Sequence, residues 1–209
     1  MKEKLRWLIA VTMFCAIFLT GCGETKMPEV IDGQTIYIGK EGEVTLWLVM
    51  DFQGADYKLS ELTSMAVEEA AQYNVGKTQE NIVAVEKVEA LAGGDKAAIT
   101  YKFGDWKSCS GFIGNDFFFG TNELFYGTVQ EALSEGYGSK VIMKNVKDNT
   151  LFTEEQLRQA GESRLIVTDM GAKIYCPGKV AYISDGARLN EDGSVDTFGV
   201  EGLAYILLK

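Results

Sequence analysis

The apolar runs of this chain are short, and their length limits what the chain can fold into. Beyond Asp32, the most apolar run, Val44 to Met50, is seven residues long, whereas a helix that crosses a bilayer needs roughly 20 apolar residues. Runs of this length that are rich in β-branched and aromatic residues, and that end at glycine-containing turns, are typical of β-strands. We therefore expect the chain beyond Asp32 to be built mainly from sheet and not to cross a membrane.

Ten segments show this strand pattern, mostly toward the two ends of the chain. The clearest hairpin joins Asn81–Leu91 to Lys96–Phe103, because the connecting Gly93-Gly94-Asp95 accepts the positive φ angles of a tight turn. From Ser163 onward we expect almost continuous β-structure. The predicted strands are Gln34–Gly39, Glu43–Phe52, Asn81–Leu91, Lys96–Phe103, Asp116–Phe119, Glu123–Tyr126, Arg164–Thr168, Lys173–Cys176, Val180–Ser184 and Leu203–Leu208.

Three helices are predicted in the middle of the chain. Leu59–Tyr73 repeats apolar residues at three- and four-residue spacing, with Ser60 available as its N-cap. Two short helices are indicated by capping boxes, in which a threonine and a Glu or Gln three residues later satisfy each other's backbone N–H groups. These helices begin at Thr128 with Glu131 and at Thr153 with Gln156, and they end at Gly136 and Gly161.

This arrangement of elements predicts the fold class. Strands and helices do not alternate regularly, which argues against a doubly wound parallel sheet. We expect an α+β fold: a mostly antiparallel sheet with one longer and two short helices, and a C-terminal part that is nearly all β. Residues 33–209 are expected to form one domain, with a division near Thr150 as the alternative.

The first residues have a different character. Met1–Trp7 carries three basic residues and one acidic residue, and the apolar run Leu8–Leu19 follows. This pattern is typical of a secretory signal. The run ends in Leu19-Thr20-Gly21-Cys22, which resembles the lipobox of bacterial lipoproteins. The resemblance implies that residues 1–21 are removed, that Cys22 carries lipid and that residues 22–32 form a flexible tether. The alternative is an ordinary signal peptide with a chance cysteine.

The charge of the chain restricts its partners. Without residues 1–21, the chain has 188 residues with 17 basic and 29 acidic side chains, a net charge of −12. Nucleic-acid binding depends on clustered Lys and Arg that neutralise phosphates, so no nucleic-acid partner is expected. By the same argument anionic headgroups would repel the domain, and lipid on Cys22 is expected to hold it at the membrane.

The chain contains no histidine, which excludes Ser-His-Asp and Cys-His catalysis and histidine-ligated zinc. No metal site, cofactor or catalytic residue is predicted. The carboxylate pairs Glu68-Glu69 and Glu154-Glu155 fall on predicted helices, where neighbouring positions point about 100° apart. A hydrolase could still bring two distant carboxylates together in space.

The remaining cysteines and one acidic loop have two interpretations each. Cys109 and Cys176 would meet oxidising conditions outside the cytoplasm, so they either form a disulfide or are two buried thiols. Asn190–Asp196 packs oxygen-bearing side chains around a glycine, but it lacks the ligand spacing of a calcium loop. A hairpin turn explains that segment better.

Aromatic residues gather with glycines in the middle of the chain. Aromatic side chains beside glycines can line a groove for sugars or peptide ends, and the alternative is core packing. The segment Gly104–Asp116 within this region is expected to be an irregular loop. The candidate ligand-binding residues are Trp106, Phe112, Phe118, Tyr126 and Tyr137.

Two further stretches resemble segments of uncharacterised lipoproteins from Gram-positive gut bacteria: Leu124–Gly138, and Pro177–Gly186 with Gly202–Lys209. The resemblance implies anchorage on the outer face of the cell membrane and carries no activity. We therefore expect a membrane-anchored, extracytoplasmic, non-enzymatic domain that binds a protein partner, a glycan or a small solute. The alternative is a cell-wall or glycan hydrolase that uses paired carboxylates.

Overall fold

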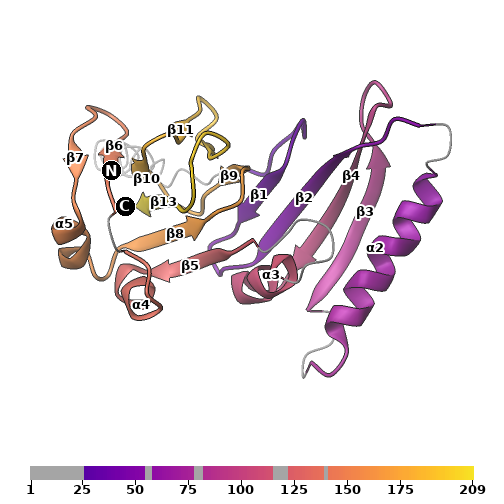
Figure 1. Ribbon diagram of the computed structural model, residues 1–209, viewed down its shortest axis with the longest axis horizontal. Helices are drawn as coiled ribbons and strands as arrows, with labels where there is room; N and C mark the ends of the chain where they lie inside the picture. The colour runs from indigo at the N-terminus through magenta and orange to yellow at the C-terminus, as the bar shows by residue number, and fades with distance from the viewer. Residues whose placement is uncertain (1–25, 55–57, 78–81, 115–121, 139–140) are drawn as a thin grey trace, which may run out of the picture.

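The computed structural model of the protein describes residues 26–54, 58–77, 82–114, 122–138 and 141–209. These ranges contain four helices and thirteen strands in two mostly antiparallel sheets (Figure 1). The predicted α+β class is confirmed, as is the predominance of sheet in the C-terminal part. None of the helices in the described ranges is long and apolar enough to cross a bilayer.

The first sheet, sheet A, has seven strands in the order β11-β12-β9-β1-β2-β4-β3. The predicted hairpin is confirmed by the antiparallel pairing of β3 with β4, and Gly93 and Gly94 have the expected positive φ angles. β1 pairs in parallel with β9, which joins the first strand to the C-terminal third of the chain. The strands are β1 Thr35–Ile38, β2 Val44–Asp51, β3 Val83–Ala90, β4 Lys96–Phe103, β9 Lys173–Tyr175, β11 Arg188–Leu189 and β12 Val195–Asp196.

The second sheet, sheet B, has six strands in the order β5-β8-β13-β10-β6-β7. Both sheets take strands from both sides of Thr150, so a domain boundary at that residue would cut each sheet. The strands are β5 Leu124–Thr128, β6 Met143–Asn145, β7 Leu151–Phe152, β8 Arg164–Thr168, β10 Val180–Ser184 and β13 Ala204–Leu208. The predicted strand Asp116–Phe119 lies outside the described residues.

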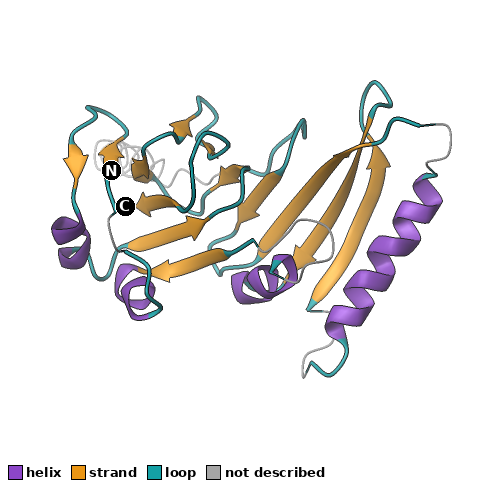
Figure 2. Cartoon of the chain, viewed as in Figure 1, coloured by secondary structure: helices purple, strands orange, loops and turns teal. Residues whose placement is uncertain are grey.

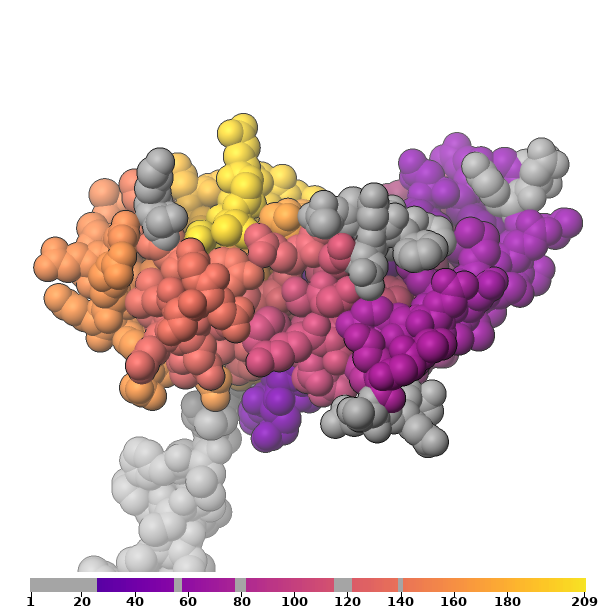
Figure 3. Space-filling model, turned by 60° about the horizontal axis from the view of Figure 1, so that its bottom comes forward, coloured from indigo at the N-terminus to yellow at the C-terminus, as the bar shows by residue number. Residues whose placement is uncertain are grey.

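The helices are α2 Leu59–Asn74, α3 Trp106–Ile113, α4 Val129–Ser134 and α5 Glu154–Gln159. They lie in a row across one face of the molecule (Figure 3). Both predicted capping boxes are present, at Thr128 with Glu131 and at Thr153 with Gln156. Gly136 follows α4 with a positive φ of 94°, which is the conformation that a C-terminal cap requires.

The prediction for the start of α2 was wrong. Lys58 is the N-cap residue and makes no side-chain capping bond, while Ser60 already lies inside the helix. The predicted apolar face is only partly buried: Leu62 and Ala66 pack against the sheet, but Met65 is exposed.

The prediction of an irregular loop over Gly104–Asp116 was also wrong, because α3 forms there. The Asp105 side chain caps this helix by accepting a hydrogen bond from the Ser108 N–H at 2.8 Å. Cys109, Phe112 and Ile113 are buried on one side of the helix. Tertiary burial therefore stabilises a segment whose glycines and short length disfavour an isolated helix.

Two hydrophobic clusters hold the fold together. The first lies under α2 and α3 and extends to one face of sheet B, and the second lies on the opposite face of sheet B under α4 and α5. Neighbouring residues of one strand consequently enter different clusters, as Ile166 and Val167 of β8 do. Burial on both faces explains why all five residues of β13 are apolar or aromatic and buried.

Candidate functional site

The predicted aromatic cluster packs into the core. Phe112 and Tyr126 are buried, and Trp106 and Tyr137 flank the buried ring of Phe125 with centroid distances of 4.9 and 5.3 Å. The core-packing alternative therefore describes these four residues, whereas Phe118 lies outside the described residues.

The two cysteines are buried thiols and not the halves of a disulfide. Burial raises the pKa of the Cys109 thiol far above its usual range, and Asp105 adds to this effect. Burial also raises the pKa of Cys176 to about 12. The thiolate is the reactive form, so neither group is poised as a nucleophile.

The carboxylates of α2 point in different directions, as adjacent helical positions predict. Glu69 faces the sheet and accepts a hydrogen bond from the Tyr101 hydroxyl at 2.9 Å, while Glu68 is exposed beside Gln72. Burial raises the pKa of Glu69, and the Tyr101 hydrogen bond opposes that rise. This carboxyl ties α2 to β4 and lines neither of the two grooves described below.

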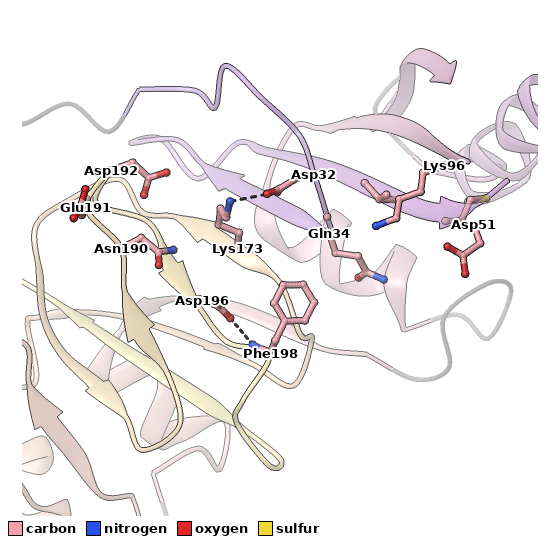
Figure 4. Close-up of a pocket in the computed structure, with 13 residues that line it drawn as sticks. Asp32, Gln34, Asp51, Lys96, Lys173, Asn190, Glu191, Asp192, Asp196 and Phe198 are labelled. Atoms are coloured by element: carbon pink, nitrogen blue, oxygen red, sulfur yellow. Dashed lines mark hydrogen bonds and ion pairs between the residues drawn. The ribbon is translucent and has the colours of Figure 1, made fainter. Parts of the chain in front are cut away.

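A shallow groove lies where sheet A meets the loops of the C-terminal third (Figure 4). Its volume is about 980 Å³. Gln34 and Phe198 lie near its middle, with Lys96 and Asp51 on one side and the turn at Asn190 on the other. Loops and turns gather on the side of the molecule away from α3 and α4 (Figure 2). We call this groove the Phe198 groove. Its lining residues are Asp32, Gly33, Gln34, Val49, Met50, Asp51, Lys96, Lys173, Asn190, Glu191, Asp192, Asp196 and Phe198.

Phe198 is the aromatic residue that stands out in this groove, because 58% of it is exposed. Its ring lies over two glycines: a Cβ at Gly171 would come within 3.1 Å of the ring, and one at Gly33 within 3.9 Å. The backbone N–H of Phe198 donates to Asp196 at 2.9 Å. The preceding residue, Thr197, is buried, and its hydroxyl contacts the carbonyls of Met170 and Ala172. The loop that presents the exposed ring is therefore fastened to the core.

One wall of the groove is the turn between β11 and β12. The Asn190 N–H donates to the Ser194 carbonyl at 2.8 Å, and Gly193 has a φ of 85°, so the predicted hairpin turn is confirmed. Asp192 accepts hydrogen bonds from Tyr175 and from Ser194. Although partial burial opposes it, these hydrogen bonds lower the pKa of Asp192. In the described ranges, no group of three or more cysteine or carboxylate side chains is placed to hold a metal ion.

The chemistry of the groove suits recognition of a polar molecule. An exposed ring offers an apolar platform, and the surrounding amides, carboxylates and lysines supply donors and acceptors. Asp51 and Lys96 face each other across the β2–β4 pair, so both signs of charge are present at that end.

Sequence reasoning missed Phe198, because a single phenylalanine in a loop gives no periodic signal. The only hint is its setting, between Asp196 and Gly199 in a stretch rich in turn residues. Whether such a ring is buried or exposed depends on strands that lie far away in the sequence. No protein-family model, curated protein or solved structure matches the chain. The functional assignment therefore depends on the geometry of the groove and on the predicted targeting signal.

Proposed function

We propose that this protein is a lipid-anchored extracytoplasmic binding protein whose Phe198 groove binds a glycan. The exposed Phe198 ring among polar side chains carries the proposal, because a sugar ring has an apolar face that stacks on an aromatic platform and hydroxyls that bind the polar rim. The basic N-terminus, the apolar run and the lipobox at Cys22 support the location.

The groove supports binding better than hydrolysis. A glycosidase needs two facing carboxyl groups, and the general acid among them has a raised pKa. Asp192 in the groove has a lowered pKa, held down by the hydrogen bonds from Ser194 and Tyr175. Among the described residues, the carboxyl group whose pKa is raised is that of Glu69, which lies on α2 and outside the groove.

The glycan hypothesis is tested by thermal unfolding of residues 23–209 against a panel of glycans and cell-wall fragments. Both hydrophobic clusters lie between Ile36 and Leu208, so this segment contains the described core. A ligand at 100 times its Kd adds about 2.7 kcal/mol, which should raise the midpoint by roughly 5–10 °C. Phe198→Ala should abolish the shift and Leu151→Ala, an exposed residue outside the groove, should keep it. A panel without any shift, or hydrolysis of a glycan, would reject the proposal.

The anchor is tested separately with Cys22→Ser in a bacterial host that lipidates exported proteins. The wild-type chain should incorporate radiolabelled fatty acid and remain in the membrane fraction. Cys22→Ser should lose the label and leave that fraction. Lipid labelling that persists in this variant would disprove the assignment of Cys22.

A further inference from the structure

A second groove lies beside the residues that lead from Cys22 to the domain. The segment Lys26–Val30 forms one part of its lining. Other parts are formed by Lys40, Lys147, Lys173, Pro177–Val180, Leu189 and Lys209. Its volume is about 1220 Å³. We call it the tether groove. It shares Asp32, Lys173 and Asp192 with the Phe198 groove, so the two lie next to each other.

The tether groove is basic although the chain is acidic. Six lysines line it, against the carboxylates of Glu29, Asp32 and Asp192, so its side chains carry a charge of +3. The chain from Cys22 onward carries −12, so the remainder of that chain carries −15. The six lysines are Lys26, Lys40, Lys147, Lys173, Lys179 and Lys209.

Exposed apolar side chains accompany these lysines. The exposed fractions are 75% for Val30, 43% for Met27 and 37% for Leu189, and all three line the tether groove. Basic and apolar side chains on one face are the combination with which proteins bind the interface of an anionic bilayer.

The length of the tether brings this face close to the membrane. Only four Cα–Cα steps separate Cys22 from Lys26, and an extended chain spans at most about 3.6 Å per residue. A lipid on Cys22 therefore holds Lys26 within about 14 Å of the bilayer surface. The Debye length is about 8 Å at physiological ionic strength. The tether is therefore short enough to let the lysines of this face come within that distance of the headgroups, while charges on the far side of the domain are largely screened.

We propose that the tether groove docks on the anionic lipid headgroups of the membrane in which Cys22 is anchored. This inference rests on the proposed lipid anchor and adds an orientation to it: the Phe198 groove opens beside the bilayer, and α2 points away from the tether. The expectation that anionic headgroups repel the domain assumes that its negative charge is evenly distributed over the surface. The basic lining reverses that expectation at the one face that the tether brings to the surface.

The test uses the lipidated chain in vesicles, with a fluorophore on Leu189→Cys in the tether groove or on Val67→Cys as the matched control. Val67 is exposed on α2, which packs on β3 at the opposite edge of sheet A. Cys109 and Cys176 are buried and should not react. Nitroxide-labelled headgroups should quench the Leu189 label and spare the Val67 label in phosphatidylglycerol-containing vesicles. In vesicles of phosphatidylcholine alone, the difference should disappear.

A charge variant shows whether the lysines cause the orientation. Lys147→Gln, Lys179→Gln and Lys209→Gln together should abolish the selective quenching, because each lysine near an anionic surface favours docking about fivefold, on the order of 100-fold for the three. The control, Lys58→Gln with Lys77→Gln and Lys87→Gln, removes the same charge from the α2–β3 edge and should keep it. Equal quenching of both labels, or an unchanged pattern in the tether-groove variant, would overturn the proposal. Fatty-acid incorporation in wild type and Cys22→Ser tests the anchor in a separate experiment. A failure of docking can therefore be distinguished from a failure of the anchor.

Discussion

Sheet B and the outer part of sheet A differ in how many of their faces are covered. All five residues of β13 in sheet B are buried because hydrophobic clusters cover both of its faces. β3, at the edge of sheet A, has one buried residue among eight, since α2 packs on one side of it. Sheet B is therefore expected to contribute more stability per residue than the outer part of sheet A. Both grooves, in contrast, lie where the short strands β9, β11 and β12 extend sheet A.

The largest expected effect is a matched deletion in the two regions. Val167→Ala in β8 removes two fully buried methyl groups and should cost about 2–3 kcal/mol of unfolding free energy. Val85→Ala in β3 makes the same chemical change at a half-buried position and should cost about 1 kcal/mol or less. Denaturant unfolding of both variants provides the measurement. Equal losses of unfolding free energy in the two variants would show that the two regions do not differ in the stability they contribute.

The next effect concerns the loop that presents Phe198. A Cβ at Gly199 would lie 2.8 Å from the carbonyl oxygen of Gly186, so Gly199→Ala must displace backbone and should destabilise by about 1–3 kcal/mol. Gly104→Ala is the matched control, because nothing lies within 4 Å of its added Cβ. Thermal unfolding should show a lower melting temperature for Gly199→Ala and one close to wild type for Gly104→Ala. An unchanged melting temperature of Gly199→Ala would show that the loop is not fixed against Gly186.

A smaller effect is expected at the capping box of α4, which covers sheet B. Thr128→Ala removes the side chain that accepts from the Glu131 N–H at 3.1 Å and should cost about 1 kcal/mol. Thr153→Ala makes the equivalent change at α5, beside the edge strand β7. Urea unfolding should show a similar loss of unfolding free energy for both variants if each helix covers the second hydrophobic cluster. No loss in either variant would contradict the capping geometry.

The pH dependence of the same capping box has a defined sign. Hydrogen bonds from the backbone and side chain of Thr128 lower the pKa of Glu131. Its stabilising contribution is therefore present above the unfolded pKa of about 4.3 and is lost as pH falls through the lower folded pKa. The melting temperatures of wild type and Glu131→Gln should converge on acidification. A difference in melting temperature between the two proteins that increases at low pH would contradict a stabilising role of the Glu131 carboxylate.

The smallest expected change in stability is that of Phe198→Ala. An exposed ring contributes little to folding, so unfolding free energy should stay within about 0.5 kcal/mol of wild type. A melt without ligand measures this. A loss as large as that of Val167→Ala would mean that Phe198 belongs to the core and is not a binding platform.

Much of the fold was predictable, because local features specify it. The capping boxes at Thr128 and Thr153 and the turn at Gly93-Gly94 are satisfied within a few residues, so their chemistry is visible in the sequence. α3 was not predictable in this way, since its stability comes from burying Cys109, Phe112 and Ile113 against distant strands. β6, β7, β11 and β12 are two or three residues long and exist through their partners.

The features of the candidate site likewise fall into those that the sequence predicts and those that depend on the tertiary structure. Residue types and local order predict a targeting signal, and they establish the absence of histidine, the strongly negative net charge and the α+β class, because each is a sum over residues or a short-range pattern. The exposure of Phe198 and the gathering of six lysines beside residues 26–30 depend on contacts between residues 26–40 and residues 147–209. A net charge of −12 carries no information about where the positive charges lie. The parallel pairing of β1 with β9 brings residues 26–34 beside the C-terminal loops and creates a basic face on an acidic protein.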